Sequence, residues 1–398
     1  MFEWFKNIFI GTEKTYITQR IPQLTGKTFN IDNSLNISTV YTCINVLSST
    51  MSRLPLELYQ TNPTTGKVKD KTDPLYSTLH YNINNYITSH SFVNYLETVR
   101  NLKGNSFAKI NRSGSKITIS ILPNWKVIGY GEINNELYYF VKETEDSEAV
   151  PINASEILHF KMMTKDGIYG VNPIESLRAN LSATDKGLSA IDNFFDNNAN
   201  SPKALKSTVM GANHNAMLQA LEKFKGEYSG AENSGKMIPL PPNTEIQELK
   251  LNFADAEFIN TIRFNTEQIA ALYNVPAYLA GINSASKFNS VEFMSLGFKV
   301  NTIAAICQMY RQEFEFKLLT NKQRLNGKSI EFNTNAMVEL DHKAKTEGYQ
   351  KLFQVGAISP NQIAEFENIP KDVNGDFKVV PMNMISTEKF NTKDDGKE

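Results

Sequence analysis

The sequence predicts an α+β fold, and two patterns in its apolar residues support that prediction. In some segments these residues recur at helical spacing, as they do at Phe258, Ile262, Ile269 and Leu272. In other segments they alternate with polar residues, as is typical of half-buried strands, and no internal repeat is present. A chain of 398 residues with 41% hydrophobic content can bury a sizeable core, so we expect about two or three folded domains.

Charge and cysteine content limit the possible partners and compartments. The formal net charge is -1, so nothing global attracts nucleic acid or anionic lipid, and any DNA contact must be local or independent of sequence. Cys43 and Cys307 both lie on apolar helical faces, which favours reduced core thiols in a reducing cytoplasm. No uncharged run approaches the ~18 residues of a transmembrane helix. We interpret residues 1–30 as an N-terminal arm, with a membrane-lying helix as the less favoured alternative.

Helices and strands are mixed in the first half of the chain. Helical spacing predicts two helices, marked by Val40, Ile44, Leu47 and Met51 and by Phe92, Leu96, Val99 and Leu102. Alternation predicts strands at residues 54–58, 117–121 and 137–141, the last two in one sheet region. The turn at residues 62–66 ends the first strand, and Gly104-Asn105 ends the second helix.

Two long helices are expected to pair and to bracket a small insert. The first begins at Asn172-Pro-Ile-Glu175, where asparagine can cap, proline suits the first helical position and glutamate completes a capping box. Its apolar seam continues to Phe195. The second runs from about residue 253 to Asn274, where Val275-Pro276 ends it. Between them the pattern predicts strands at residues 205–210, 237–243 and 245–251 and a short helix at 217–228.

An exposed loop and a very long helix follow the second paired helix. Residues 281–288 are mostly small and polar, which predicts a loop. Asn289-Ser-Val-Glu292 has capping-box spacing, and the helix after it should run about thirty residues, or roughly 45 Å. A returning strand is predicted at residues 330–333, two short helices at about 341–356 and 359–366, and a disordered polar tail from Lys371 to Glu398.

The residues that usually carry chemistry form no recognisable site. The five histidines have no paired metal spacing, and no Cys-x-x-Cys occurs. Gly327-Lys328-Ser329 lacks the leading glycine of a phosphate loop, and Gly129-Tyr-Gly131 lacks the third glycine of a dinucleotide-binding turn. Asp192, Asp196 and Asp255 flank helices, where acidic residues are usually solvated, which disfavours a nuclease site. We therefore predict no enzymatic activity and no cofactor.

Several stretches, taken in order, resemble the portal proteins of tailed bacteriophages, in particular the compact portals of long-tailed siphophages. They are Thr39–Leu47, Arg53–Tyr59, Leu102–Ile110, Tyr169–Pro173, Phe194–Pro202, Asn265–Pro276 and Val380–Asn383. The resemblance covers about Ser38 to Met384, and the ordered series is more specific than any single stretch. Two local departures are Ser106, where the family usually has alanine, and Tyr81-Asn-Ile-Asn84, which lacks a proline often found before the family's asparagine.

The resemblance implies a ring, usually dodecameric, at one capsid vertex, through which DNA is packaged and later ejected. It places the protein in the virion, at the portal vertex of a capsid assembled in the host bacterial cytoplasm. It also implies a division of the chain into a wing (31–175 and 321–338), stem helices (176–200 and 253–275), an α/β clip (201–252), a tunnel loop (276–289), a long kinked helix (290–320), a small helical crown (339–370) and a flexible tail (371–398).

The implied partners are further copies of the chain, double-stranded DNA bound without sequence specificity, the terminase large subunit, a head-completion or adaptor protein, and the major capsid and scaffolding proteins. No membrane is implied. The resemblance assigns DNA contacts to the tunnel-loop residues Asn283, Ser284, Ser286, Lys287 and Asn289. It assigns terminase and connector contacts to the clip residues Lys203, Lys206, Glu222, Lys223, Lys225 and Glu227. Two alternatives stay open: a head structural protein without a channel, and a DNA-processing enzyme of the packaging machinery, which the missing phosphate loop and metal ligands disfavour.

Overall fold

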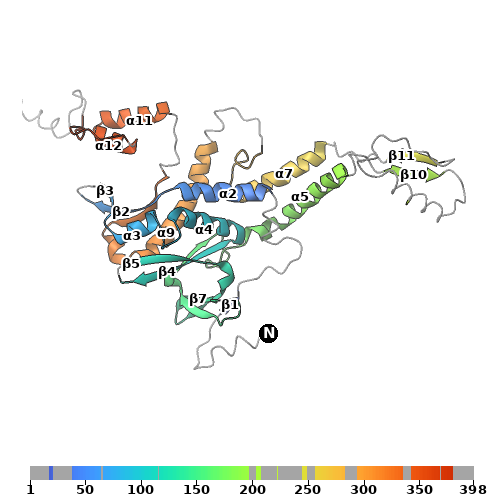
Figure 1. The fold of residues 1–398 in the computed structure, drawn as a ribbon, viewed down its shortest axis with the longest axis horizontal. Helices are drawn as coiled ribbons and strands as arrows, with labels where there is room; N and C mark the ends of the chain where they lie inside the picture. Colours follow the sequence, from blue (N-terminus) through green and yellow to red (C-terminus); the bar gives the residue numbers. More distant parts are fainter. Residues whose placement is uncertain are drawn as a thin grey trace, which may run out of the picture. The chain divides into compact units, whose positions relative to one another are not determined.

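The structure is a computed structural model, and it describes residues 18–20, 38–63, 66–114, 116–196, 203–207, 222, 244–248, 256–282, 294–334, 342–367 and 369–379. Internal contacts divide the chain into two compact units, unit 1 (Met1–Asn333) and unit 2 (Thr334–Glu398). Unit 1 mixes helices and strands, which confirms the predicted α+β class, and the elements described in unit 2 are helices (Figure 1).

Two helices of unit 1, α2 (Ser38–Arg53) and α4 (Ser89–Lys103), lie side by side (Figure 1). Apolar residues at helical spacing give each helix one buried face. The hydroxyl of Thr88 accepts a hydrogen bond from the N–H of Ser91 at the start of α4, and Gly104, with φ 77°, ends the helix. A shorter helix, α3 (Pro74–His80), begins after the capping residue Asp73. Both helices predicted from spacing, and the break at Gly104, are confirmed.

Besides the pair β10 (Lys203–Ser207) and β11 (Thr244–Glu248), the described residues of unit 1 form three antiparallel sheets. The first has the order β12-β2-β3, with β12 (Lys328–Phe332), β2 (Leu56–Asn62) and β3 (Gly66–Lys69). The second has the order β5-β4-β9, with β5 (Lys116–Leu122), β4 (Asn105–Ser113) and β9 (Ile157–Lys161). The third has the order β1-β6-β7-β8, with β1 (Thr18–Arg20), β6 (Val127–Ile133), β7 (Glu136–Val141) and β8 (Val150–Asn153).

The predicted strands are present, but one prediction about their pairing is wrong. The strand predicted at 330–333 returns as β12 to pair with β2, although the two are far apart in sequence. Residues 117–121 and 137–141 were expected in one sheet region, whereas β5 and β7 belong to different sheets. After β5, Pro123 and the 3-10 turn η2 (Asn124–Lys126) redirect the chain, because proline cannot donate a ladder hydrogen bond. The next strand, β6, therefore pairs with β7.

Part of the core of unit 1 surrounds α9 (Ala304–Leu318), which packs against both β9 and β12. The ring of Tyr310 stacks on that of Phe160 with 4.2 Å between centroids and meets Phe332 edge-on at 5.9 Å. Its hydroxyl donates to the buried carboxylate of Glu97 at 3.1 Å, and Glu97 also pairs with the buried guanidinium of Arg100. Because each of these buried polar groups has a partner, the core avoids the cost of an isolated charge. Through these contacts α9 joins helix α4 to two sheets.

The helix that contains α9 is not a regular α-helix throughout. It is described from Met294, and residues Phe298–Ile303 form a π-helical segment, η5, before α9 begins. A π segment accommodates an extra residue in the helix through i→i+5 hydrogen bonds. The capping box predicted at residues 289–292 lies outside the described residues. A short helix, α10 (Asn321–Leu325), follows α9 and leads into β12.

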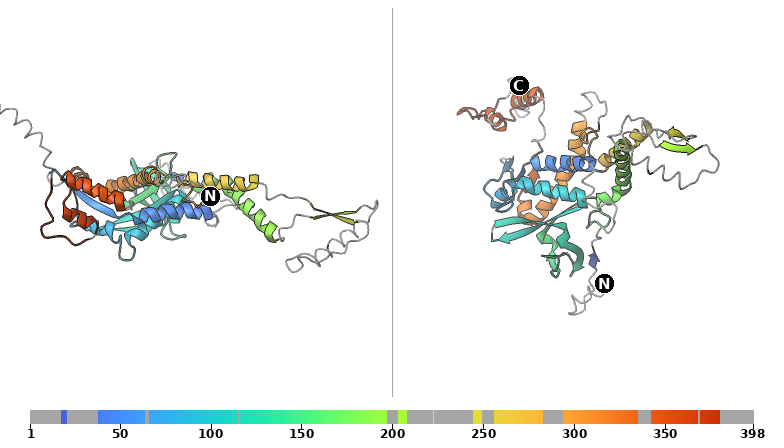
Figure 2. Two further views of the ribbon diagram at one scale, coloured as in Figure 1. Left: turned by 90° about the horizontal axis from the view of Figure 1, so that it is seen from above. Right: turned by 45° about the vertical axis from the view of Figure 1, so that its right-hand side comes forward.

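The two long helices predicted to pair, α5 (Pro173–Asp196) and α7 (Ala256–Leu272), lie side by side (Figures 1 and 2). The side chain of Asn172 accepts a hydrogen bond from the N–H of Ile174 at 2.9 Å, and Pro173 occupies the first helical position, as predicted. Between the helices in sequence, β10 (Lys203–Ser207) pairs antiparallel with β11 (Thr244–Glu248). The insert strands predicted at 205–210 and 245–251 are therefore present with shifted ends, and the predictions for 217–228, except Glu222, and 237–243 fall outside the described residues.

Unit 2 contains the two short helices predicted near the end of the chain, α11 (His342–Gln354) and α12 (Pro360–Phe366). Ser359 caps α12 in a reciprocal box with Gln362, and Pro360 occupies the first turn. The segment that sequence analysis assigned to the tail begins with a loop that hydrogen-bonds to α12 through Asn361. The first residues of that segment are therefore packed on unit 2.

Candidate functional site

Two stretches that carry the family resemblance meet where α5 begins. A Cβ added at Gly170 would lie 2.1 Å from the carbonyl oxygen of Gly104, so no other residue fits there without displacing backbone. The side-chain amide of Asn105 donates to the carbonyl of Gly170 at 2.8 Å and accepts from its N–H at 2.7 Å. Asn105 therefore pairs with Gly170 as a backbone group would, and this pairing holds the segment that leads into Pro173 and α5.

A buried histidine completes this junction. The Nε2 atom of His159 lies 2.9 Å from Oδ1 of Asn105, and its Nδ1 lies 2.8 Å from the hydroxyl of Tyr139. Because Oδ1 of Asn105 accepts from Gly170, His159 donates from Nε2 and accepts from Tyr139 at Nδ1. Burial, reinforced by the positive charges of Lys161 and Lys317, lowers the pKa of His159 well below its usual value. The neutral ring thus joins two sheets directly behind the start of α5.

The base of the predicted tunnel loop is held at both ends. Asn274, with φ 52°, follows the end of α7, and its carbonyl accepts a hydrogen bond from the hydroxyl of Thr302 in η5 at 2.8 Å. The hydroxyls of Tyr278, near the start of the loop, and Ser295, after the loop, lie 2.8 Å apart. Pattern reasoning missed these two polar contacts, because each joins residues on separate elements. The predicted DNA-contacting residues themselves, Asn283, Ser284, Ser286, Lys287 and Asn289, lie outside the described residues.

The long helix has apolar side chains on two sides. Phe298 and Ile303 are buried against unit 1, whereas Leu296 is 56% exposed and Val300 is 58% exposed. A helix that is apolar on opposite sides is normally covered on both. Phe264 on α7 is likewise 58% exposed. Exposed apolar residues at i and i+4 on one helix are typical of a surface that another protein chain covers.

The structure brings some of the predicted clip residues together. In the two-stranded sheet of β10 and β11, Lys203 is opposite Glu248 and Lys206 is opposite Glu245. Glu222 is described as helical and exposed. The other predicted clip residues, Lys223, Lys225 and Glu227, lie outside the described residues. Opposite charges that face each other across an antiparallel pair stabilise the pairing of the two strands. The register of β10 and β11 therefore gives Lys203 and Lys206 a role in stabilising this sheet.

Burial and hydrogen bonding shift the pKa of several titratable groups among the described residues. Burial raises the pKa of the free thiols Cys43 and Cys307 to about 12, which keeps both protonated. Asp166 accepts from the hydroxyl of Tyr130 and from backbone N–H groups, which lower its pKa to about 2 and fix a turn. Within the described ranges, no cluster of three or more His, Cys, Asp or Glu residues could hold a metal ion. None of the described helices is long and apolar enough to span a membrane.

Solved structures with the same fold define the class of protein. The crystal structure of an HK97 family phage portal protein from Corynebacterium diphtheriae matches with a TM-score of 0.55, covering 78% of this chain and 97% of that one at 14% identity. The neck of a native GTA particle, computed with C12 symmetry, matches with a TM-score of 0.55, covering 89% of this chain and 96% of that one at 14% identity. The fold is therefore that of phage portal proteins.

Sequence comparison establishes the family. The portal protein of Enterobacteria phage HK97 is 24% identical over 382 residues, covering 92% of this chain and 88% of that protein. The probable portal protein of Streptomyces phage phiC31 is 22% identical over 375 residues, covering 90% and 80%. The family model described as Phage portal protein matches residues 38–368. The chain belongs to the phage portal protein family, and its function is that of a portal channel at the capsid vertex for DNA packaging.

Proposed function

We propose that twelve copies of the chain form a closed ring and that the long helix of each copy packs against its neighbour. The observation that carries this proposal is the exposed apolar side of that helix, at Leu296 and Val300, which the described part of one subunit leaves uncovered. A closed ring requires a heterologous interface, in which two different surfaces of the same chain meet. Twelve is the copy number of the C12 neck whose fold this chain shares.

Native mass spectrometry of the full chain tests the ring. Assemblies at a multiple of 44.9 kDa corresponding to a ring are expected, and monomer alone across a wide concentration range would contradict the proposal. Val300→Asp should shift the population towards monomer, because it places a charge in the interface. Val300→Leu, which keeps the apolar surface, is the matched control and should leave rings intact. Equal ring formation by both variants would mean that this side of the helix is not the interface.

The tunnel loop, residues 276–289, is proposed to line the narrow part of the channel and to contact DNA without gripping it. Each phosphate neutralised by a fixed cation adds affinity, so a strongly basic ring would slow a sliding duplex. Between Gly281 and Asn289 the chain has one cation, Lys287, among small polar residues that can contact any DNA backbone. The hydrogen bonds of Tyr278 with Ser295 and of Thr302 with Asn274 support this role, because they fix the chain on both sides of the segment that contains these residues.

In vitro packaging tests the loop. Lys287→Ala should leave folding and ring assembly unchanged but alter the rate or completeness of packaging. Replacing Ser284, Ser286 and Asn289 with arginine should slow translocation, and more so at low salt, where phosphate contacts are strongest. Replacing the same residues with glutamine, which adds length without charge, is the control. Packaging at the wild-type rate by the arginine variant at every salt concentration would place the loop away from DNA.

The clip, residues 201–252, is proposed to dock the terminase large subunit and later a head-completion or adaptor protein. Its lysines and glutamates present both signs of charge, which suits partners that are exchanged in turn. Lys203 and Lys206 are three residues apart on β10, and residues so spaced belong to opposite faces of a strand. We therefore expect the two lysines to face different surroundings, with no more than one of them at a given flat interface.

Charge reversal tests the clip. Lys223→Glu with Lys225→Glu should weaken terminase docking while leaving rings intact, because the change reverses local charge without touching the described core. Lys351→Glu, at an exposed lysine on α11 outside the clip, is the control for a charge reversal away from the clip. Binding of the terminase large subunit to assembled rings, measured against salt concentration, provides the readout. Unchanged docking would assign Lys223 and Lys225 to an ordinary solvated surface.

The remaining parts follow the same division of the chain. The pairing of β12 with β2 supports a wing that combines residues 31–175 with 321–338, and we propose that this wing meets the major capsid and scaffolding proteins during assembly in the host bacterial cytoplasm. We propose that residues 339–370 form the crown. ATP turnover by the purified chain would favour a packaging enzyme. Assemblies without a central hole under negative stain would favour a head protein without a channel.

A further inference from the structure

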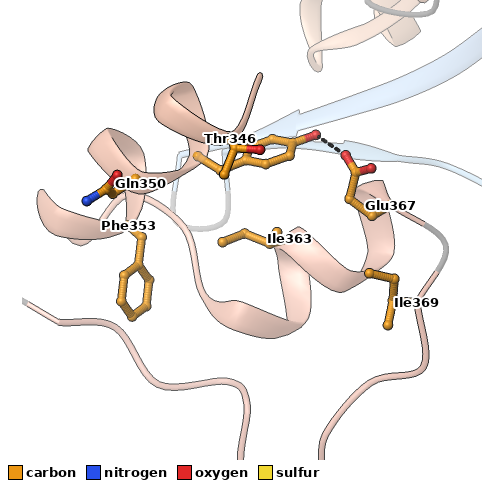
Figure 3. Close-up of a pocket in the computed structure, with 7 residues that line it drawn as sticks. Thr346, Gln350, Phe353, Ile363, Glu367 and Ile369 are labelled. Atoms are coloured by element: carbon orange, nitrogen blue, oxygen red, sulfur yellow. Dashed lines mark hydrogen bonds between the residues drawn. The ribbon is translucent and has the colours of Figure 1, made fainter. Parts of the chain in front are cut away.

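Unit 2 has a pocket between its two helices with a volume of about 420 Å³ (Figure 3). The hydroxyl of Tyr349 donates to Glu367 at 2.9 Å, and this bond joins α11 to the chain just after α12 (Figure 3). With that carboxylate engaged, much of the remaining wall is apolar. The pocket is lined by Thr346, Tyr349, Gln350, Phe353, Ile363, Glu367 and Ile369. Ile369 is 58% exposed at its edge, so the pocket is open to an apolar group from outside.

The same unit has a projecting apolar residue on a fixed loop. Val373 is 97% exposed, although it lies beside the well-packed residue Asn361. The side-chain amide of Asn361 donates to the carbonyl of Asp372 and accepts from its N–H, both at 2.9 Å, and the N–H of Asn361 donates to the carbonyl of Gly375 at 3.0 Å. A Cβ at Gly375 would lie 2.3 Å from Oδ1 of Asn361, so the loop packs tightly on α12. These contacts hold Val373 outward.

A fixed apolar projection and an open apolar pocket on one small unit are the two halves of a heterologous contact. In a ring, each subunit offers one surface to the neighbour on one side and a different surface to the neighbour on the other. We propose that Val373 of one copy inserts into the pocket of unit 2 of the neighbouring copy. This inference rests on the proposed ring, which holds neighbouring copies at high local concentration.

The local structure favours Val373 of a neighbouring copy, rather than a segment that must first become ordered, as the occupant of the pocket. Because the loop of residues 372–375 is already held by Asn361, inserting Val373 requires little further ordering of the chain. Phe366, which is 57% exposed and stacks on Tyr349 with 6.1 Å between ring centroids, lies beside the pocket and would gain cover from the same contact. In a closed ring the contact between Val373 and the pocket would repeat between every two neighbouring copies.

Disulfide trapping in assembled rings tests the contact. Val373→Cys and Gln350→Cys introduce one thiol in the loop and one at the pocket, while the native thiols of Cys43 and Cys307 are buried. Mild oxidation of the double variant should give a ladder of linked chains on a denaturing gel. Mixing the two single variants before assembly should give linked dimers. Leu352→Cys, on the same helix but outside the pocket lining, replaces Gln350→Cys in the control pair and should give no ladder.

Ring stability gives a second measurement that does not depend on thiol geometry. Val373→Asp should raise the concentration at which half of the rings dissociate by about tenfold relative to wild type, and Val373→Ile should leave it near the wild-type value. Rings that give no ladder and dissociate equally in both variants would overturn this inference and leave the ring intact. A link formed only within one chain, or an equal ladder with Leu352→Cys, would also overturn it. Monomer alone in native mass spectrometry would contradict the ring itself and this contact with it.

Discussion

Lowering the pH below about 6.5 is expected to destabilise unit 1 through His159. Both ring nitrogens are engaged in the folded protein, Nε2 as a donor to Asn105 and Nδ1 as an acceptor from Tyr139. A second proton on the ring would have to bind at Nδ1, where it would replace the hydrogen bond from Tyr139 inside the core. Burial first, and then Lys161 and Lys317, lower the pKa of His159 well below that of an unfolded histidine.

The sign and size of the effect follow from proton linkage. An unfolded histidine has a pKa of about 6.5, so below that pH the unfolded chain binds a proton that folded His159 does not. The free energy of unfolding therefore falls as the pH falls. The loss is about 1.4 kcal/mol at pH 5.5 relative to pH 7.5, provided that folded His159 stays neutral. Asp166, whose pKa is lowered to about 2, stays ionised throughout this window and adds no pH dependence to it.

Urea unfolding at pH 7.5 and pH 5.5, followed by tryptophan fluorescence, measures this loss. His159→Gln keeps a donor and an acceptor at the site but does not titrate, so its unfolding free energy should lose about 1.4 kcal/mol less than that of the wild type over the same interval. His90→Gln, at an exposed position on α4, is the control and should behave as wild type. An equal loss in wild type and His159→Gln would refute the assignment of a neutral, buried histidine.

Three further changes test the packing around the candidate site. Gly170→Ala should destabilise unit 1 by about 2 to 4 kcal/mol in urea unfolding, because its Cβ would meet the carbonyl of Gly104. Gly348→Ala should stabilise unit 2 by about 0.5 to 1 kcal/mol, measured as a higher thermal midpoint, since this position in α11 has open space around it. Thr302→Val should cost about 1 kcal/mol and increase amide exchange near the carbonyl of Asn274, which loses its donor.

The helices were predictable because their signals are local. Asn172 and Pro173 mark the start of α5, Gly104 marks the end of α4, and Val275-Pro276 follows the end of α7 closely. Each signal reflects the backbone hydrogen bonding or geometry of a helix terminus, which depends on residues within one turn. The pairing of α5 with α7 was also predictable, because both have an apolar seam and only a small insert separates them.

The π segment left a trace in the sequence that regular helical spacing does not account for. Phe298 and Ile303, both buried, are five residues apart, whereas the following buried residues Cys307, Tyr310 and Phe314 are three or four apart. A step of five is the spacing that an extra residue in a π segment produces. The bond from Thr302 to the end of α7 left no such trace, because it joins residues whose contact depends on tertiary structure.

The junction of Asn105, His159 and Gly170 shows what sequence pattern cannot provide. Gly104-Asn105 was identified as the end of a helix and as part of a stretch that carries the family resemblance, and His159 only as a histidine without metal spacing. Their roles depend on an approach between strand β4, strand β9 and the segment before α5, which no local pattern encodes. The carbonyl and N–H of Gly170 determine which side-chain atom of Asn105 is the oxygen and which is the nitrogen. The position of that oxygen then determines which nitrogen of His159 bears the proton.

Residues that join copies of a chain obey the same sequence pattern as residues that fill its core. Leu296 and Val300 continue the apolar character of the long helix as Phe298 and Ile303 do, and only their exposed fractions separate the two pairs. Val373 does not belong to a helix, so no helical pattern marks it. It is distinguished by a nearly fully exposed side chain on a loop that Asn361 holds in place. For a protein whose function is a channel, the burial of an apolar side chain within one subunit is therefore more informative than the sequence pattern around it. An apolar residue that its own subunit holds firmly and leaves uncovered is where a neighbouring copy is expected to bind.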